Sequence, residues 1–339
     1  MGKLVGSASI LPDPDLFVFM YVRREAVLSS QIEGTHASLM DILEYEASQH
    51  QPDRGLDVRE VSNYVAALRY GLERVKALPL SLRLLREIHT VLMQDVRGGE
   101  DHKTPGEFRR SQNWIGGPSP ATARYVPPPV EAMHVALDQF ERALHDGSEL
   151  PLLIKIGLAH AQFETIHPFL DGNGRVGRLL ITFMLCHERL LSEPLLYLSI
   201  FFKQNRDEYY HRLQAVRDHG LWEDWLAFFL EGVATVAEEA TTTAKEIVDL
   251  RERLRNRIAE TLGRRSGRAL QLLDHLFKSP VVSTKQVQDV VSLSQPAAGA
   301  LVNAMCEAGV LRETTGRRRN RLFRFADYLG LFKDREKRA

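Results

Sequence analysis

The chain has little cysteine, no excess charge of either sign and no long apolar run. Its 339 residues include two cysteines, Cys186 and Cys306, which are too few for a disulfide framework or a zinc cluster. We expect both to be buried free thiols. The 44 Lys and Arg residues balance 44 Asp and Glu, so the net charge at pH 7 is +0. This balance argues against a surface that coats nucleic acid or an anionic membrane as a whole, although it allows local basic patches.

The N-terminal residues, MGKLVGSASILPDPDL, lack the apolar core of a signal peptide, and Gly6 stands where a myristoylation site needs Ser or Thr. The longest apolar stretch, near Leu185, is far shorter than the roughly 20 residues that span a bilayer. We therefore expect a cytoplasmic protein with no membrane partner. The hydrophobic fraction of 44% and the charged fraction of 26% are typical of globular domains.

Most of the chain repeats apolar residues every three or four positions, which is the spacing of amphipathic helices. The pattern predicts helices over 15–33, 56–75, 82–95, 130–145, 152–166, 175–190, 206–217 and 221–240. In the first two thirds only 113–128 indicates β structure, since NWIG and RYVP flank a GGPSPATA turn there. The predicted fold class is therefore mainly α with a short hairpin or flap. A doubly wound sheet is excluded because strands do not alternate with helices.

The composition changes near residue 235. A charged helix over 236–265 is expected to connect two bodies, and three short helices followed by two strands over 266–339 are typical of a winged helix-turn-helix domain. The turn between the two strands is basic, with only Glu313 opposing its arginines. These arginines are Arg312, Arg317, Arg318, Arg319, Arg321 and Arg324. DNA is one partner that such a wing suits. The third helix, QPAAGALVNAMCEAG, is poor in base-reading side chains, so protein docking or dimerisation is the alternative.

The most informative segment is a loop between two predicted buried helices, with the sequence HPFLDGNGRVGR over 167–178. Gly172, Asn173 and Gly174 can turn successive backbone N–H groups to one side and form an anion nest. The nest opens onto a helix N-terminus, where backbone donors and the helix dipole favour phosphate. Arg175 and Arg178 lie three apart in the first turn of that helix, where two cations oppose the dipole unless an anion joins them.

Two more residues of this loop carry chemistry. Asp171 offers an oxygen for Mg²⁺, which bridges phosphates through one or two carboxylates. His167 ends the preceding helix and is the candidate general base near neutral pH. Phe169 is expected to be an inward anchor. The alternative without function is a glycine-rich turn with a solvated arginine pair, which leaves the joint presence of base, metal ligand, nest and cations unexplained.

The segment resembles the Fic family signature, HPFx(D/E)GNGRxxR, at every specified position. Most Fic proteins transfer AMP from ATP to a hydroxyl side chain of a target protein. The resemblance implies that His167 deprotonates a Ser, Thr or Tyr of the target and that Asp171 holds Mg²⁺. It also implies that the backbone of 172–174 binds phosphate oxygens, while Arg175 and Arg178 contact the β- and γ-phosphates. Family members that act as kinases depart from the GNGR core, which this chain keeps.

The end of the first predicted helix, about 19–34, has the sequence SSQIEG from Ser29 to Gly34. A carboxylate in a last turn faces the negative end of the dipole, so Glu33 either has a cationic partner or is exposed to water. The run resembles the inhibitory motif (S/T)xxxE(G/N) of the Fic subclass with an N-terminal inhibitory helix. The resemblance implies that Glu33 pairs with Arg178, obstructs the γ-phosphate and keeps activity low. In some relatives this glutamate also supports removal of AMP.

Three features lie around the loop. Gly106 to Arg109 is similar to a GxxR segment that precedes the flap of many Fic proteins. The flap edge either aligns a target by strand addition or belongs to a plain surface hairpin. Asn205 and Tyr209 fall four apart on one helix face. They either contact the ribose or adenine or serve as an N-cap and a core tyrosine. The other histidines, such as His36, His160 and His187, lack metal-ligand spacing and are expected to be packing or surface residues.

These features predict a Fic-fold helical bundle with a flap and a C-terminal winged helix-turn-helix domain. The expected division is an N-terminal helical region over 1–95, a Fic core over 96–235, a connecting helix over 236–265 and the winged domain over 266–339. The leading interpretation is an autoinhibited protein adenylyltransferase that uses ATP and Mg²⁺, acts on a target protein or itself, and forms a homodimer. The alternatives are a Fic enzyme that mainly removes AMP or transfers another phosphate-linked group, and a DNA-binding regulator with a nucleotide-sensing core.

Overall fold

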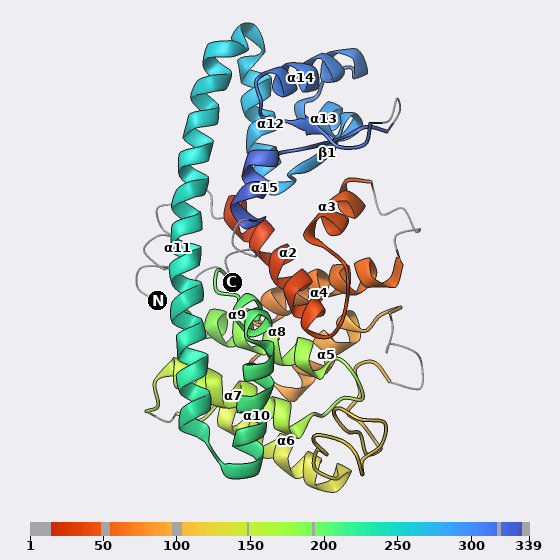
Figure 1. The fold of residues 1–339 in the computed structure, drawn as a ribbon, viewed down its shortest axis with the longest axis vertical. Coiled ribbons are helices and arrows are strands. Elements are labelled where there is room, and N and C mark those ends of the chain that lie inside the picture. Colours follow the sequence, from red (N-terminus) through yellow and green to blue (C-terminus); the bar gives the residue numbers. More distant parts are fainter. Residues whose placement is uncertain are drawn as a thin grey trace. The chain divides into compact units, whose positions relative to one another are not determined.

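The computed structural model describes residues 15–48, 55–96, 104–147, 149–191, 194–316 and 320–333. They form two compact units (Figure 1). The first unit comprises Arg24–Ala37 and Leu56–Ala237, and the second comprises Ser38–Gly55, Glu238–Ala339 and the chain up to Arg23. The predicted mainly helical class is confirmed, because helices dominate both units and the only sheet among the described residues has three short strands. No helix in the described part of the chain is long and apolar enough to cross a membrane.

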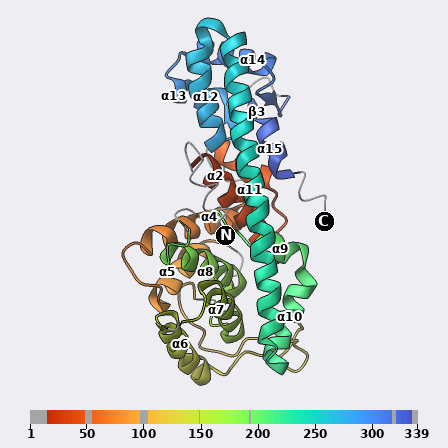
Figure 2. The same ribbon diagram turned by 90° about the vertical axis from the view of Figure 1, so that its left-hand side faces the viewer.

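The first unit consists mainly of helices. They are α4 (Gly55–Arg74), α5 (Leu82–Leu92), α6 (Val130–Leu144), α7 (Leu152–Ile166), α8 (Asn173–His187), α9 (Ser199–Gln204) and α10 (Arg206–His219), with parts of α2 (Asp15–Ile32) and α11 (Trp222–Thr261). α8 packs against α7 and α5 (Figure 2). Its residues are buried almost without interruption from Asn173 to Leu185, because helices cover it on several sides. The phosphate-loop candidate therefore opens onto the most enclosed helix of this unit.

The predicted flap between α5 and α6 is present in a short form. A single antiparallel bridge joins Ile115 and Tyr125, whose backbone N–H and carbonyl are 2.8 Å apart. Gly117 sits in the turn at φ +100°, and a Cβ there would lie 2.5 Å from the carbonyl oxygen of Thr122. The turn thus depends on a glycine at this position.

The second unit combines short helices with the sheet. Its elements are α3 (Leu39–Ala47), the 3₁₀ turn η2 (Gly263–Arg265), α12 (Ser266–Lys278), β1 (Val281–Ser283), α13 (Thr284–Val291), α14 (Gln295–Glu307), β2 (Arg312–Glu313), β3 (Leu322–Arg324) and α15 (Ala326–Lys333), together with parts of α2 and α11. The sheet is antiparallel with the order β1-β3-β2, and Val282 pairs with Phe323. Three helices and two terminal strands follow the order expected from the sequence.

Several elements differ from the sequence prediction. The helix predicted over 221–240 and the connector over 236–265 are one helix, α11, because buried residues continue at helical spacing beyond Ala240 through Ala244, Ile247, Leu250 and Leu254. α3, α9, α15 and β1 were not predicted. β1 has only three residues, which are too few to show an alternating pattern. α3 begins with a capping box of Ser38 and Asp41, a signal that the sequence prediction did not use.

Candidate active site

The segment 167–178 forms the end of α7, a tight loop and the start of α8, as predicted. His167 adopts a left-handed backbone conformation, with φ 49° and ψ 61°, and its N–H donates to the carbonyl of Phe163 at 2.9 Å. Gly172 is also left-handed, at φ 77°, and α8 begins at the next residue. The first backbone bond of α8 runs from Val176 to Gly172, so the earlier N–H groups of this helix have no acceptor within it. N–H groups left open in this way at a helix N-terminus can bind an anion.

Asn173 fixes the shape of this loop. Its Oδ1 accepts the N–H of Phe169 at 2.8 Å, and its Nδ2 donates to the carbonyl of the same residue at 2.7 Å. The Phe169 ring is fully buried, so it is the inward anchor expected from the sequence. The side chain of Asn173 therefore braces the loop, which leaves its backbone as the part that can face phosphate.

His89 on α5 packs against the loop and bonds to its backbone. It was not identified from the sequence as a site residue. Its ring stacks on Phe169 with centroids 3.8 Å apart and planes at 4°. Its Nδ1 accepts the N–H of Gly106 at 2.8 Å, so the neutral ring carries its proton on Nε2, which donates to the carbonyl of Asp171 at 3.0 Å. Burial lowers the pKa of His89 to about 4. The only signal in the sequence was a histidine on the apolar face of a helix, which does not distinguish this role from ordinary packing.

Arg109, from the GxxR segment, fixes the backbone on the other side of the loop. The side chain is fully buried, and its Nε donates to the carbonyl of His167 at 3.1 Å. The backbone N–H of Arg109 donates to the carbonyl of Pro168 at 2.8 Å, and its Nη2 donates to the carbonyl of Pro128 beyond the flap. The single side chain of Arg109 thus bonds both to the backbone of the candidate base and to the chain that follows the flap.

His167 itself is a neutral imidazole. Burial, together with the positive charge of Arg217, lowers its pKa to about 4. Its Nδ1 is buried and has no hydrogen-bond partner in the part of the chain that the structure describes. Nearby, the Tyr125 hydroxyl of the flap donates to the carbonyl of Thr165 at 2.8 Å, and the Arg217 guanidinium lies 4.1 Å from the centre of the Tyr125 ring. The flap is therefore tied to the last turn of α7, next to His167.

Glu33 and Arg178 form the ion pair expected from the sequence. Arg178 Nη2 donates to Glu33 Oε1 at 2.7 Å and to the carbonyl of Ser29 at 3.0 Å, and its Nε donates to Ser29 Oγ at 2.8 Å. The Arg178 side chain is 2% exposed and that of Glu33 is 35% exposed. Burial opposes the charge of Arg178, but Glu33 and the neighbouring tyrosines together outweigh it, so the pKa of Arg178 is raised. A Cβ at Gly174 would clash with Glu33 Oε1, so this carboxylate lies against the N-terminus of α8.

The end of α2 holds Glu33 in this place. Gly34 has φ +96°, and its N–H donates to the carbonyl of Gln31, while that of Thr35 donates to the carbonyl of Ser30, both at 3.1 Å. These two bonds define a Schellman motif in which Gly34 takes the left-handed position. Arg206 Nε donates to the carbonyl of Ile32 at 3.3 Å, which places a second cation at the negative end of the helix.

Arg175 is buried but weakly paired. Its Nη1 lies 3.8 Å from Glu60 Oε2, and its Nη2 lies 3.8 Å from Asp171 Oδ1. Its Nε and Nη1 have no hydrogen-bond partner among the described residues. A buried guanidinium with unused donors is costly, and an anion at the loop would satisfy them.

Asp171 is the one motif residue suited to hold a metal ion. Its side chain is 39% exposed, and its Oδ1 accepts the N–H of Gly172 at 2.6 Å. Within the described part of the chain, no three His, Cys, Asp or Glu residues cluster as a resident metal site requires. A single accessible carboxylate beside a phosphate nest fits Mg²⁺, which takes its other oxygen ligands from phosphates and water.

Asn205 precedes Arg206, whose side chain contacts the end of α2. Asn205 separates α9 from α10, and its Nδ2 donates to the carbonyl of Phe201 at 3.0 Å. It borders a hollow of about 280 Å³ that Glu208, Arg212 and Asp224 also line. Tyr209 is in the core, where its hydroxyl is 2.8 Å from His160 Nε2. The tyrosine is therefore a core residue, as the second interpretation held.

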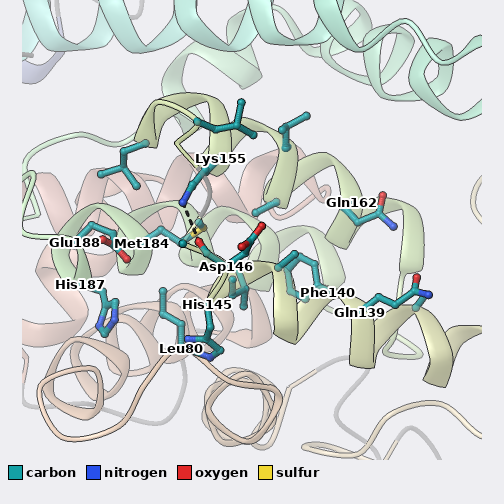
Figure 3. A pocket seen from close by; sticks show the side chains of 18 of the residues that line it. Leu80, Gln139, Phe140, His145, Asp146, Lys155, Gln162, Met184, His187 and Glu188 are labelled. Carbon is teal, nitrogen blue, oxygen red and sulfur yellow. Dashed lines mark hydrogen bonds between the residues drawn. The ribbon is translucent and has the colours of Figure 1, made fainter.

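A larger groove of about 840 Å³ lies among α6, α7 and the end of α8 (Figure 3). Lys155 crosses part of it, and its Nζ donates to the carbonyl of Asp146 at 3.0 Å. Other lining residues include Phe140, Met184 and His187. No residue from 167 to 178 lines this groove, so it is separate from the phosphate loop.

Comparisons with known proteins agree with the motif. The Fic/DOC family N-terminal model matches residues 1–73, and the Fic/DOC family model matches residues 79–185. The chain is 33% identical over 162 residues to the "Protein adenylyltransferase Fic" of Drosophila virilis, and 32% identical over 162 residues to that of Drosophila melanogaster. These matches cover 47% of this chain and 30% of each relative, so the chain spans less than a third of their length.

Solved structures share the fold. A Fic family protein from Desulfovibrio desulfuricans G20 aligns with a TM-score of 0.59 and 18% identity, over 96% of this chain and 93% of that one. A Fic domain containing signaling protein from Bacteroides thetaiotaomicron VPI-5482 aligns with a TM-score of 0.54 and 19% identity, over 72% and 94% of the two chains. The helical fold, the loop between α7 and α8 and the two family models lead to one conclusion: the chain belongs to the Fic/DOC family.

Proposed function

We propose that this protein transfers AMP from ATP to a Ser, Thr or Tyr hydroxyl of a target protein, and that Glu33 inhibits the transfer. The observation that carries the proposal is one braced loop, with a neutral histidine at one end and an open helix N-terminus with two buried arginines at the other. The curated relatives, which bear the name protein adenylyltransferase, support the same reaction.

In the proposed reaction the target oxygen attacks the α-phosphorus, its proton passes to His167, and the bond to the bridging oxygen breaks to release pyrophosphate. The pKa of about 4 keeps His167 neutral before the substrate arrives. The negative charge of a bound triphosphate raises the pKa of this imidazole and makes it a better base. Asp171 would hold Mg²⁺, which would neutralise charge on the phosphates. The N–H groups of 172–174, with Arg175 and Arg178, would orient the phosphate chain.

Inhibition follows from the position of the Glu33 carboxylate. It occupies Arg178 and lies against Gly174, where a phosphate oxygen would otherwise accept from the helix N-terminus. A triphosphate must then either displace Glu33 or bind with its terminal phosphate displaced, and the second outcome misplaces the α-phosphorus relative to His167.

The other assignments are also proposals. We infer that α12, α13, α14 and the β2–β3 pair form a winged helix-turn-helix domain. The proposed domain boundaries lie after residues 95, 235 and 265. Of the wing arginines, 317–319 lie outside the described residues, and Arg321 pairs with Glu313 at 2.9 Å. This pair reduces the positive charge available for DNA. We also propose that the target protein docks along the flap, that the protein can modify itself, and that it is a cytoplasmic homodimer. Asn205 remains the candidate contact to the ribose or adenine.

The test compares wild type, Glu33→Gly and His167→Ala with ATP radiolabelled at either the α- or the γ-phosphate. We expect Glu33→Gly to increase α-label on a target or on the protein itself at least about tenfold, because it frees a buried cation for phosphate. His167→Ala should abolish incorporation in both backgrounds. Transfer of γ-label would identify a kinase instead. Faster loss of AMP from a premodified protein by wild type than by Glu33→Gly would favour the removal reaction.

A further inference from the structure

The residue after Gly34 is anchored to a different helix. Thr35 is 4% exposed, and its Oγ1 donates to Glu60 Oε2 on α4 at 2.8 Å. The next backbone N–H, that of His36, donates to Asp57 Oδ2 one turn earlier on α4 at 2.8 Å. Two carboxylates of α4 thus hold the chain directly after the Schellman motif. Because that motif links Thr35 to Ser30, the anchor fixes the turn that carries Glu33.

The same oxygen of Glu60 also faces the phosphate site. Glu60 Oε2 lies 3.8 Å from Arg175 Nη1, a distance that gives Coulomb attraction without a hydrogen bond. Glu60 is itself only 6% exposed. A buried carboxylate is strongly desolvated, so it depends on its partners, and one oxygen of Glu60 is divided between the inhibitory turn and a phosphate-binding arginine.

We propose that Glu60 is a positioning residue that stabilises the inhibited, nucleotide-free state in two ways. It holds Thr35, and with it Glu33, in the docked position, and it attracts Arg175 in competition with a triphosphate. This inference deepens the proposed function and rests on it. Glu60 touches no reacting atom, and its effect on AMP transfer passes through Thr35 and Arg175.

The first experiment removes the anchor without touching the motif. Thr35→Val deletes the hydroxyl that donates to Glu60 and keeps the side-chain shape. We expect incorporation of α-label to rise about tenfold, as for loss of one hydrogen bond to a charged acceptor, and to stay unchanged when Glu33→Gly is already present. Thr35→Ser should restore the wild-type rate. Thr243→Val is the matched control, since Thr243 is equally buried but donates to the carbonyl of Glu239 in the second unit.

The second experiment separates the two effects of Glu60. In the Glu33→Gly background, Glu60→Gln keeps an acceptor for Thr35 and removes the charge beside Arg175. We expect the dissociation constant of ATP to fall about fivefold, as for removal of one charge near 4 Å in a well-screened site, whereas Thr35→Val should leave it unchanged. An unchanged or weaker affinity in Glu60→Gln would overturn the competition for Arg175.

A third measurement is independent of catalysis. In His167→Ala protein, Thr35→Val should accelerate hydrogen exchange of the Gly34 and Thr35 amides about tenfold, because the turn loses its anchor to α4. Unchanged exchange would overturn the anchoring role of Glu60. If Thr35→Val accelerates exchange and neither Thr35→Val nor Glu33→Gly increases AMP transfer, the proposed inhibition is contradicted. The anchoring of the turn by Glu60 is then still supported.

Discussion

At the scale of single residues, Glu164 is the most unusual group near the loop. It lies in the last turn of α7, three residues before His167, and its Oε1 is buried with no hydrogen-bond partner among the residues that the structure describes. A Cβ at Gly177 would lie 2.5 Å from this oxygen, so the carboxyl packs against the backbone of α8. Burial raises the pKa of Glu164 to about 7, while Arg178 lowers it and Glu33 raises it. This carboxyl therefore changes charge near neutral pH beside the phosphate site.

We expect Glu164→Gln to stabilise the protein above pH 7. The pKa of Glu164 is higher in the folded state, about 7, than the ordinary value of 4.5. Its contribution to stability is thus complete below pH 4.5 and is lost as the pH rises to about 7. The free energy of unfolding of Glu164→Gln, measured in urea, should exceed that of wild type by up to about 3 kcal/mol at pH 8 and should approach it near pH 5. The exposed Glu131→Gln is the control, and a pH-independent difference would refute the assignment.

At the scale of elements, the end of α2 shows how sequence and tertiary contacts share one task. Gly34 after the last apolar residue predicted the helix end, and the structure has α2 ending at Ile32. The buried Ser29 gave no sign of its partner, since Arg178, which donates to it, lies 149 residues away along the chain. A local cap was therefore predictable, and the family resemblance implied the pair of Glu33 with Arg178 on α8. The contacts of Ser29 with Arg178 and of Thr35 with α4 were not predictable.

Gly34→Ala tests this lock. Gly34 has φ +96° with nothing within 4 Å of an added Cβ, so alanine meets backbone strain alone. We expect the strain, about 1–2 kcal/mol, to loosen the turn and raise AMP transfer several-fold in wild type, with no change in Glu33→Gly. Gly220→Ala is matched to it, because Gly220 ends α10 at φ +65° with equally open surroundings. Equal activation by both variants would show a general loss of rigidity instead.

At the scale of the whole molecule, the balance of 44 basic and 44 acidic residues hides an uneven placement of charge. Arg175 and Arg178 are buried beside the loop, and three histidines around them are kept neutral. Burial is the main cause in each: it lowers the pKa of His89 to about 4, of His160 to about 3 and of His167 to about 4. Protonating any of them adds positive charge to a buried site that already holds two guanidinium groups.

Acid should therefore unfold the first unit early. A pKa lower in the folded state than the ordinary 6.5 means that stability is complete above pH 6.5 and is lost as the pH falls towards 4. We expect the urea midpoint to drop steeply between pH 6.5 and pH 4. In His89→Phe, which keeps the ring stacked on Phe169, the slope should be shallower, because one titrating group is gone. An equally steep slope in this variant would contradict the assignment.

The loop between two helices, most helices and the helix end at Gly34 were predictable from the sequence, because they depend on periodicity, turn residues and neighbours close along the chain. Tertiary structure decided which residues brace the loop. His89, Arg109 and Glu60 come from three separate segments, and only packing against α8 brings them to it. It also decided that α11 is one helix. Long-range contacts determine which residues are buried. Burial keeps His167 neutral and leaves the Arg175 guanidinium only weakly paired, and neither property can be read from a local sequence pattern.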